Sequence, residues 1–183
     1  MGGMSRPPRA RDLVLDAYEE ILIAGGERAA TMDAAARAAG VSKGGLLYHF
    51  ASKEALEAGL IGRLNDLVDE DVVAITTAEE GAVAHYLRTS VLVGDPLDRA
   101  MLAVSRLAQG GSAPASTALK EMRQRWAEAV RPHVRDDAAL DLVLLVSDGL
   151  YFNNMLEDRS DTLVPTGAAM DALVRLVEEL SIG

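Results

Sequence analysis

The sequence contains no cysteine, so it can form no disulfide framework and offers no thiolate nucleophile or thiolate metal site. Its three histidines, His49, His85 and His133, lie in separate segments, and none of them is clustered with carboxylates as a metal site requires. No serine occupies a nucleophile elbow, and no glycine-rich phosphate loop follows a strand. From these absences we expect no catalytic residue, no bound metal and no cofactor.

Long apolar runs are also missing, because no stretch approaches the roughly 18 to 20 residues that a membrane-spanning helix needs. The arginines near the first residues have no apolar segment behind them, so a secretory signal is not expected. Hydrophobic residues make up 49% of the chain and charged residues 25%, which is typical of a globular protein. We therefore expect a cytoplasmic protein that does not interact with membranes.

Lysine is scarce, and the net charge of −10 at first argues against nucleic acid as a partner. The distribution of charge is more informative. Residues 1–53 carry seven Lys and Arg against six Asp and Glu, whereas residues 54–183 carry 11 against 22. Since DNA binding depends on local cationic contacts, this distribution is compatible with an N-terminal DNA-binding domain on an acidic C-terminal body.

The pattern of apolar residues shows no strand-like alternation, and it predicts an all-α fold of about nine helices. The first helix, residues 9–24, has an apolar face and a stop signal at Gly25-Gly26. Three more helices begin at the capping residues Thr31, Ser42 and Ser52. Later helices are expected after Asp95-Pro96, between the loop at 110–114 and Pro132, over 138–156 and over 167–181.

Residues 31–50 have the features of a helix-turn-helix unit. Gly40 supplies the left-handed turn position, and Ser42 caps a second helix whose amide end faces outward. Gly44-Gly45 is unfavourable inside a short helix and indicates close approach of its backbone to a partner. Lys43 is then the expected base-edge contact. Phosphate contacts are expected from Tyr48, His49 and Lys53.

The segment TMDAAARAAGVSKGGLLYHFASKEAL, residues 31–56, resembles the DNA-binding signature of TetR-type transcriptional regulators, and the resemblance extends over roughly residues 9–60. It implies an all-helical homodimer with an N-terminal DNA-binding domain and a variable C-terminal body that binds a small ligand. It places eight residues at DNA-contacting positions: Thr31, Ser42, Lys43, Gly44, Gly45, Tyr48, His49 and Lys53. The domains implied are 1–51, with a flexible arm at 1–8, and 52–183.

The sequence departs from the family pattern at Ala35, where a larger aliphatic is usual, and at Leu47, where an aromatic is common. Gly45 replaces a small side chain that often contacts a base. These departures leave open which base pairs are recognised. Tyr48 considered alone fits core packing as well as phosphate contact, and the basic arm with Arg6, Arg9 and Arg11 fits either a simple tail or a DNA contact.

The body offers two predictions. The helix at 138–156 is apolar almost all round and the helix at 167–181 has two apolar flanks, so the two are expected to pair with their copies in a homodimer; filling one subunit's core is the alternative. Large apolar residues on the middle helices suit a cavity for a small, largely apolar effector, although such residues are also common in plain cores. The candidate ligand-binding residues are Met101, Met122, Trp126, Tyr151 and Met155.

These observations predict a repressor that binds a palindromic operator as a homodimer and is released by its effector. Ligand binding would shift the fourth helix, which begins beside the recognition helix and ends in the C-terminal domain, and this shift would separate the two recognition helices. The alternative is a helical ligand-binding or protein-interaction module whose helix-turn-helix no longer binds DNA.

Overall fold

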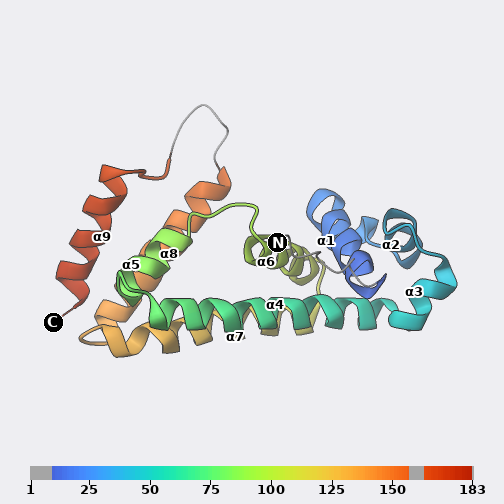
Figure 1. Ribbon diagram of the computed structural model, residues 1–183, viewed down its shortest axis with the longest axis horizontal. Helices are drawn as coiled ribbons and strands as arrows, with labels where there is room; N and C mark the ends of the chain where they lie inside the picture. Colours follow the sequence, from blue (N-terminus) through green and yellow to red (C-terminus); the bar gives the residue numbers. More distant parts are fainter. Residues whose placement is uncertain (1–9, 157–162, 183) are drawn as a thin grey trace, which may run out of the picture. The chain divides into compact units, whose positions relative to one another are not determined.

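The computed structural model describes residues 10–156 and 163–182. Every element within these ranges is helical, which confirms the predicted all-α fold (Figure 1). The elements are α1 (Ala10–Ala29), α2 (Met32–Ala38), α3 (Lys43–His49), α4 (Lys53–Thr77), α5 (Ala82–Thr89), α6 (Pro96–Gln109), α7 (Ala113–Val130), a short 3-10 turn (Arg131–His133), α8 (Asp137–Leu156) and α9 (Ala168–Ser181). No helix in the described ranges is long and apolar enough to cross a membrane.

The helices form two compact units. The first unit contains the chain up to Asp66 together with Pro96–Lys120, and the second contains Leu67–Asp95 and the chain from Glu121 onward. Two helices, α4 and α7, contribute residues to both units. These are units of packing, and the functional division between residues 51 and 52 stays a prediction.

In the first unit, α1 packs against α2, α3 and α6. The apolar face predicted for α1 contributes Val14, Tyr18 and Leu22 to the core, whereas Leu13 from the same predicted face is 39% exposed. Leu46 of α3 and Phe50 directly after it are buried, so one side of the short α3 is anchored in this unit. Each fully buried large side chain of this kind stabilises the fold by roughly 1.5 to 3 kcal/mol.

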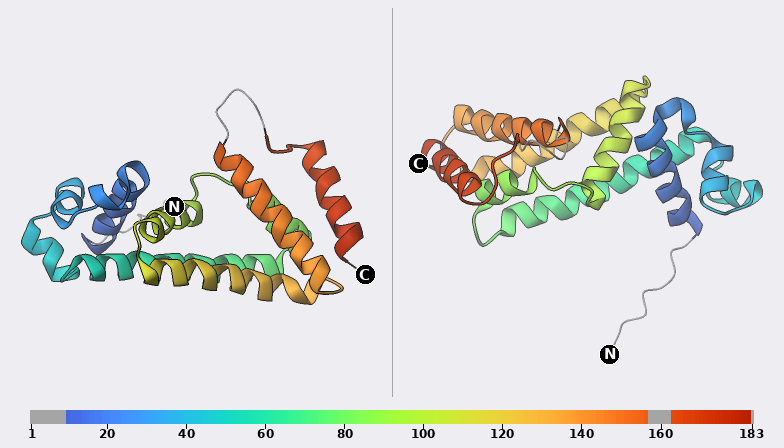
Figure 2. Two further views of the ribbon diagram at one scale, coloured as in Figure 1. Left: turned by 180° about the vertical axis from the view of Figure 1, so that it is seen from behind. Right: turned by 90° about the horizontal axis from the view of Figure 1, so that it is seen from above.

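The second unit is built on contacts among α5, α8 and α9, and both views in Figure 2 show α9 alongside α8. Its core combines Val83 and Leu87 of α5 with Val143 of α8 and Val174 and Val177 of α9. Both α5 and α9 are strongly amphipathic. Their apolar faces pack against the largely apolar α8.

The stop signal predicted at Gly25-Gly26 is present in the structure. Gly26 has a non-helical backbone with a φ of 70°, so the first helical segment of α1 ends there, and a short further turn continues to Ala29. The fourth helix begins directly after the predicted cap Ser52 and runs to Thr77. The arm at residues 1–8 lies outside the described residues.

Candidate nucleic-acid interface and ligand-binding cluster

The turn between α2 and α3 is fixed by three local features that the sequence predicted. The Ala34 amide donates to Thr31 Oγ1 at 3.1 Å, and the Gly45 amide donates to Ser42 Oγ at 3.0 Å. Gly40 lies between the two helices with a φ of 68°, a backbone conformation that L side chains rarely adopt. Both caps are formed within the unit, so the hydroxyls of Thr31 and Ser42 already accept one hydrogen bond each.

At the start of α3, Lys43 forms an ion pair with Asp33 of α2, with 2.9 Å between Nζ and Oδ1. Both side chains are more than three-fifths exposed, so water screens this pair strongly. No atom outside the local backbone lies within 4 Å of a Cβ placed on Gly44. The first turn of α3 therefore presents one lysine and a bare stretch of backbone at the surface.

Tyr48 is 86% exposed, which excludes it from the core of the unit. Its ring meets the exposed His49 edge-on, with 5.1 Å between ring centroids. The buried Leu46 lies on the opposite side of the same helix turn. The exposed side of α3 thus carries aromatic side chains that can donate hydrogen bonds, whereas its buried side carries the apolar Leu46.

Lys53, at the first position of α4, is half-buried and forms an ion pair with Glu27 of α1. Ser52 caps α4 by accepting from the Ala55 amide at 3.2 Å. Ser52 also lowers the pKa of Glu54 through a hydrogen bond. The guanidinium of Arg11 lies 5.4 Å from the centroid of the Phe50 ring, so it interacts within the unit. Arg6 and Arg9 lie outside the described residues.

The five predicted ligand-binding residues are divided between the two units. Met101 belongs to the first unit, and the other four belong to the second. Met122 is buried, Trp126 and Tyr151 are half-buried, and Met155 is 52% exposed. Their role in ligand binding stays a prediction. Of the five, Trp126 has the most informative surroundings.

Trp126 of α7 forms a cluster with an acid on α4 and a tyrosine on α5. The Trp126 Nε1–H donates to Asp71 Oδ2 at 2.8 Å. The ring of Tyr86 lies at 6.0 Å between centroids and is tilted by 56° relative to the indole. Burial raises the pKa of Asp71 above its ordinary value, and the Trp126 hydrogen bond opposes that shift. Sequence reasoning missed Asp71, because its partner lies 55 positions further along the chain.

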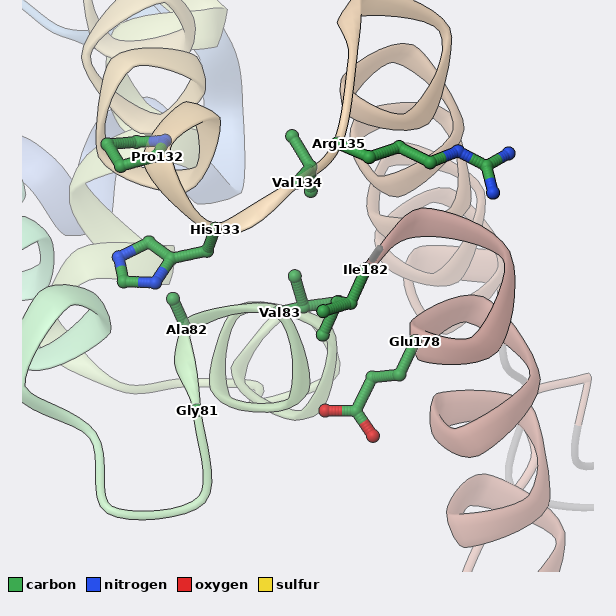
Figure 3. Close-up of a pocket in the computed structure, with 9 residues that line it drawn as sticks. All are labelled: Gly81, Ala82, Val83, Pro132, His133, Val134, Arg135, Glu178 and Ile182. Atoms are coloured by element: carbon green, nitrogen blue, oxygen red, sulfur yellow. The ribbon is translucent and has the colours of Figure 1, made fainter.

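A separate pocket of about 480 Å³ lies in the second unit (Figure 3). Its lining comes from the start of α5, the turn before α8 and the end of α9, and it contains none of the predicted ligand-binding residues. The imidazole of His133 lies beside Ala82, and the carboxylate of Glu178 points toward Gly81. In the described parts of the chain, no group of three or more His, Asp or Glu side chains could hold a metal ion.

Two capped short helices joined by a tight turn, the second of them exposed on one side, have the arrangement of the helix-turn-helix unit of DNA-binding proteins. Residues 14–58 match the model of the family described as bacterial regulatory proteins, tetR family. This match covers the helix-turn-helix part of the chain, and it agrees with the resemblance of residues 31–56 to the DNA-binding signature of TetR-type regulators. No curated protein matches the chain.

Solved structures with a similar fold cover most of the chain. A member of the TetR family from Streptomyces coelicolor A3 is 20% identical, with a TM-score of 0.67 over 96% of this chain and 100% of that one. The multidrug binding protein EbrR, complexed with malachite green, is 22% identical, with a TM-score of 0.67 over 92% and 98%. Salmonella enterica GusR is 16% identical, with a TM-score of 0.65 over 98% of each chain.

Proposed function

We propose that this protein is a transcriptional repressor that binds a palindromic operator as a cytoplasmic homodimer and is released by a small, largely apolar effector. The observation that carries the proposal is the two-sided character of α3. Leu46 and Phe50 anchor it in the first unit, while Lys43, Gly44 and Tyr48 are exposed. A helix held in this way can enter a major groove with its cationic end leading.

The contacts expected at the DNA follow from the chemistry of each group. Lys43 can reach a base edge because its pair with Asp33 is exposed and easily exchanged. Tyr48 and His49 are exposed and can donate to phosphate oxygens. Lys53 would have to leave Glu27 to contact a phosphate, so it is the most costly of the proposed contacts.

Apolar exposure on α8 and α9 supports the homodimer. On α8, Leu145, Phe152 and Leu156 are 65%, 61% and 55% exposed, and their spacing of seven and four places them on one side of the helix. On α9, Leu176 and Leu180 are 52% and 47% exposed. We call these five residues the α8–α9 stripe. Pairing of the stripe with its copy would form a four-helix interface, with room for close approach at Gly149.

The proposed release mechanism uses α4 as the connection. This helix begins at Lys53, directly after α3, and carries Asp71, which accepts a hydrogen bond from Trp126, six residues before its end at Thr77. An effector that binds one arrangement of α4 more tightly than another would shift the population away from the DNA-binding form. The EbrR complexes with malachite green and ethidium support a small-molecule site in this fold.

Selection of genomic DNA fragments with the purified protein tests the proposal. We expect enrichment of a palindromic site whose half-sites are about 34 Å apart along the helix axis. A matched protein with Lys43→Ala and Tyr48→Ala, both at exposed positions, should enrich the site far less. If the unaltered protein enriches no palindromic site, the chain is instead a ligand-binding or interaction module that no longer binds DNA.

A further inference from the structure

We propose that Glu57 of α4 makes DNA binding depend on pH, because it takes up a proton when Lys53 leaves Glu27 to contact a phosphate. The inference rests on the proposed function, since it assigns Glu57 a role in controlling the proposed DNA contact of Lys53. Every group that it involves lies in the first unit.

Lys53 has two half-buried acids beside it. Its ammonium group forms an ion pair with the carboxylate of Glu27, near the end of α1. Glu57 follows four residues later on α4, so it lies on the same face of the helix as Lys53. The positive charge of Lys53 acts to lower the pKa of Glu57. One lysine therefore offsets the negative charge of two carboxylates.

The groups around these acids are closely packed and add little positive charge. The Ser112 hydroxyl, in the loop before α7, donates to Glu57 Oε2 over a long 3.4 Å. A Cβ placed on Gly110 would lie 2.8 Å from Glu27 Cγ, so the same loop packs against Glu27. The Tyr18 hydroxyl of α1 is fully buried and has no hydrogen-bond partner within the described parts of the chain. Burial raises the pKa of Tyr18 well above its ordinary value, and Glu57 and Glu27 add to that rise.

The protonation of Glu57 depends on where Lys53 lies. Burial raises the pKa of Glu57 above the ordinary glutamate value of 4.5, and Lys53 is the largest opposing influence. Transfer of Lys53 to a phosphate removes that influence and leaves Glu27 and Glu54 to raise the pKa further. The complex therefore keeps a proton on Glu57 at pH values where the free protein has lost it.

The sign of the pH dependence follows from this uptake of a proton. DNA binding is tightest below the pKa of Glu57 in the free protein, where the group is already neutral. Binding weakens as the pH rises toward the higher pKa in the complex, and it is constant above that value. At low pH the neutral Glu57 needs no counter-charge, so Lys53 moves to DNA at less cost.

His49 is a second source of pH dependence with the same sign, because a protonated imidazole attracts phosphate. It belongs to the proposed interface, so every protein compared on DNA carries His49→Gln as a common background. The other two histidines, His85 and His133, lie in the second unit and stay the same in all variants. Differences between variants then report on the acids of the first unit.

The first test uses the full-length protein without DNA. Lys53→Met removes the charge and keeps a long side chain, so it reproduces the loss of Lys53 from the acids. NMR of the Glu57 carboxyl carbon, assigned by its absence in Glu57→Gln, gives the pH at which the group titrates. We expect the midpoint to move to higher pH in Lys53→Met. Lys43→Met is the matched control, because Lys43 pairs with Asp33 instead, and it should leave the midpoint in place.

The second test measures operator affinity by fluorescence anisotropy from about pH 5 to about pH 8 at constant salt. Uptake of one proton predicts a fall in affinity of up to about tenfold for each unit of rise in pH. Glu57→Gln keeps an acceptor for Ser112 and should reduce the change over the whole range to about twofold or less. Glu57→Asp should restore the dependence. The matched control Glu54→Gln removes the same charge at an exposed position and should retain it.

Two results would overturn the inference: the same Glu57 midpoint with and without Lys53, or an equal pH dependence in Glu57→Gln and Glu54→Gln. Either result would leave operator binding itself in place. Failure to select any operator would instead refute the proposed function, and the titration without DNA would still decide whether Lys53 controls the protonation of Glu57.

Discussion

Lys43 is the residue whose proposed contact with DNA bases can be separated most clearly from general electrostatic attraction to DNA. Its ammonium group sits at the leading end of α3, paired with the exposed Asp33. A base-edge contact contributes to discrimination between sequences, whereas a phosphate contact contributes to all sequences alike.

Replacement of Lys43 by alanine should therefore relax sequence preference more than it lowers nonspecific binding. We expect a loss of about 1 to 3 kcal/mol in the free-energy difference between operator and unrelated DNA. Fluorescence anisotropy with both DNAs at one salt concentration measures that difference. Arg37→Ala, at an exposed position of α2, is a control for loss of positive charge. A uniform loss on both DNAs would show that Lys43 contacts only phosphate.

A substitution at Gly44 can separate the stability of α3 from the proposed close approach of its backbone to DNA. A Cβ at this position meets no atom within 4 Å, so Gly44→Ala should stabilise the free protein by about 0.5 to 1 kcal/mol through helix propensity. If the backbone approaches DNA closely, the same methyl group should weaken operator binding by about tenfold. Chemical denaturation and anisotropy measure the two effects. Unchanged operator affinity would show that Gly44 is not at the interface.

For single residues, the sequence was sufficient to predict hydrogen bonds between near neighbours in the chain, but it could not predict those between distant residues. The caps at Thr31, Ser42 and Ser52 each join residues three apart, so the residue type and spacing predict them. The pairing of Trp126 with Asp71 joins residues 55 apart and depends on how helices pack. Nothing in the local sequence distinguishes Asp71 from the other acids of α4.

Among the elements, α1 is held to α4 and α6 by a buried ion network. Glu19 of α1 is only 4% exposed, and its carboxylate accepts from Arg99 of α6 at 2.9 Å and from Arg63 of α4 at 3.4 Å. Arg63 also pairs with Asp16 at 2.7 Å. Both arginines converge on one carboxylate, so its removal leaves two cations without their buried partner.

Glu19→Ala should lower the free energy of unfolding by about 3 kcal/mol, because it breaks a buried charge network on one side. Glu20→Ala is the matched control: its side chain is 71% exposed and lies 3.7 Å from Arg99, and we expect a change below about 0.5 kcal/mol. Urea denaturation measures both variants. Equal small losses would show that water screens the Glu19 network as well.

Element types followed from the sequence more reliably than element ends did. Apolar periodicity and capping residues predicted α2, α3, α8 and α9 closely. The double glycine interrupts α1 at Gly26, as its sequence predicts, but the sequence does not predict the further turn that reaches Ala29. Ala30 directly after that turn is buried, so packing within the unit stabilises it.

For the whole molecule, the decisive question is whether two copies associate through the α8–α9 stripe. The sequence showed that 138–156 is too apolar for a helix with one solvent face, and the structure shows Leu145 and Phe152 exposed on the single chain. Sequence alone could not separate core from interface, because both require apolar residues at the same helical spacing.

Leu145→Glu should place a charge in the centre of the proposed interface and shift the protein to monomer at micromolar concentration. Sedimentation velocity measures the change. Val73→Glu is the matched control, because Val73 is a 60% exposed apolar residue on α4, outside the stripe. We expect the control to remain dimeric. If the unaltered protein is already monomeric at micromolar concentration, the homodimer proposal is wrong.

The most direct test of the account is to map where α3 lies on DNA. The chain has no cysteine, so Leu47→Cys on the exposed side of α3 provides a single attachment point for an iron chelate that cleaves nearby DNA. On the selected operator, we predict two symmetric cleavage centres about 10 base pairs apart, one for each subunit, in successive major grooves. Diffuse cleavage, or a single centre, would contradict a dimeric regulator that inserts α3 into the major groove.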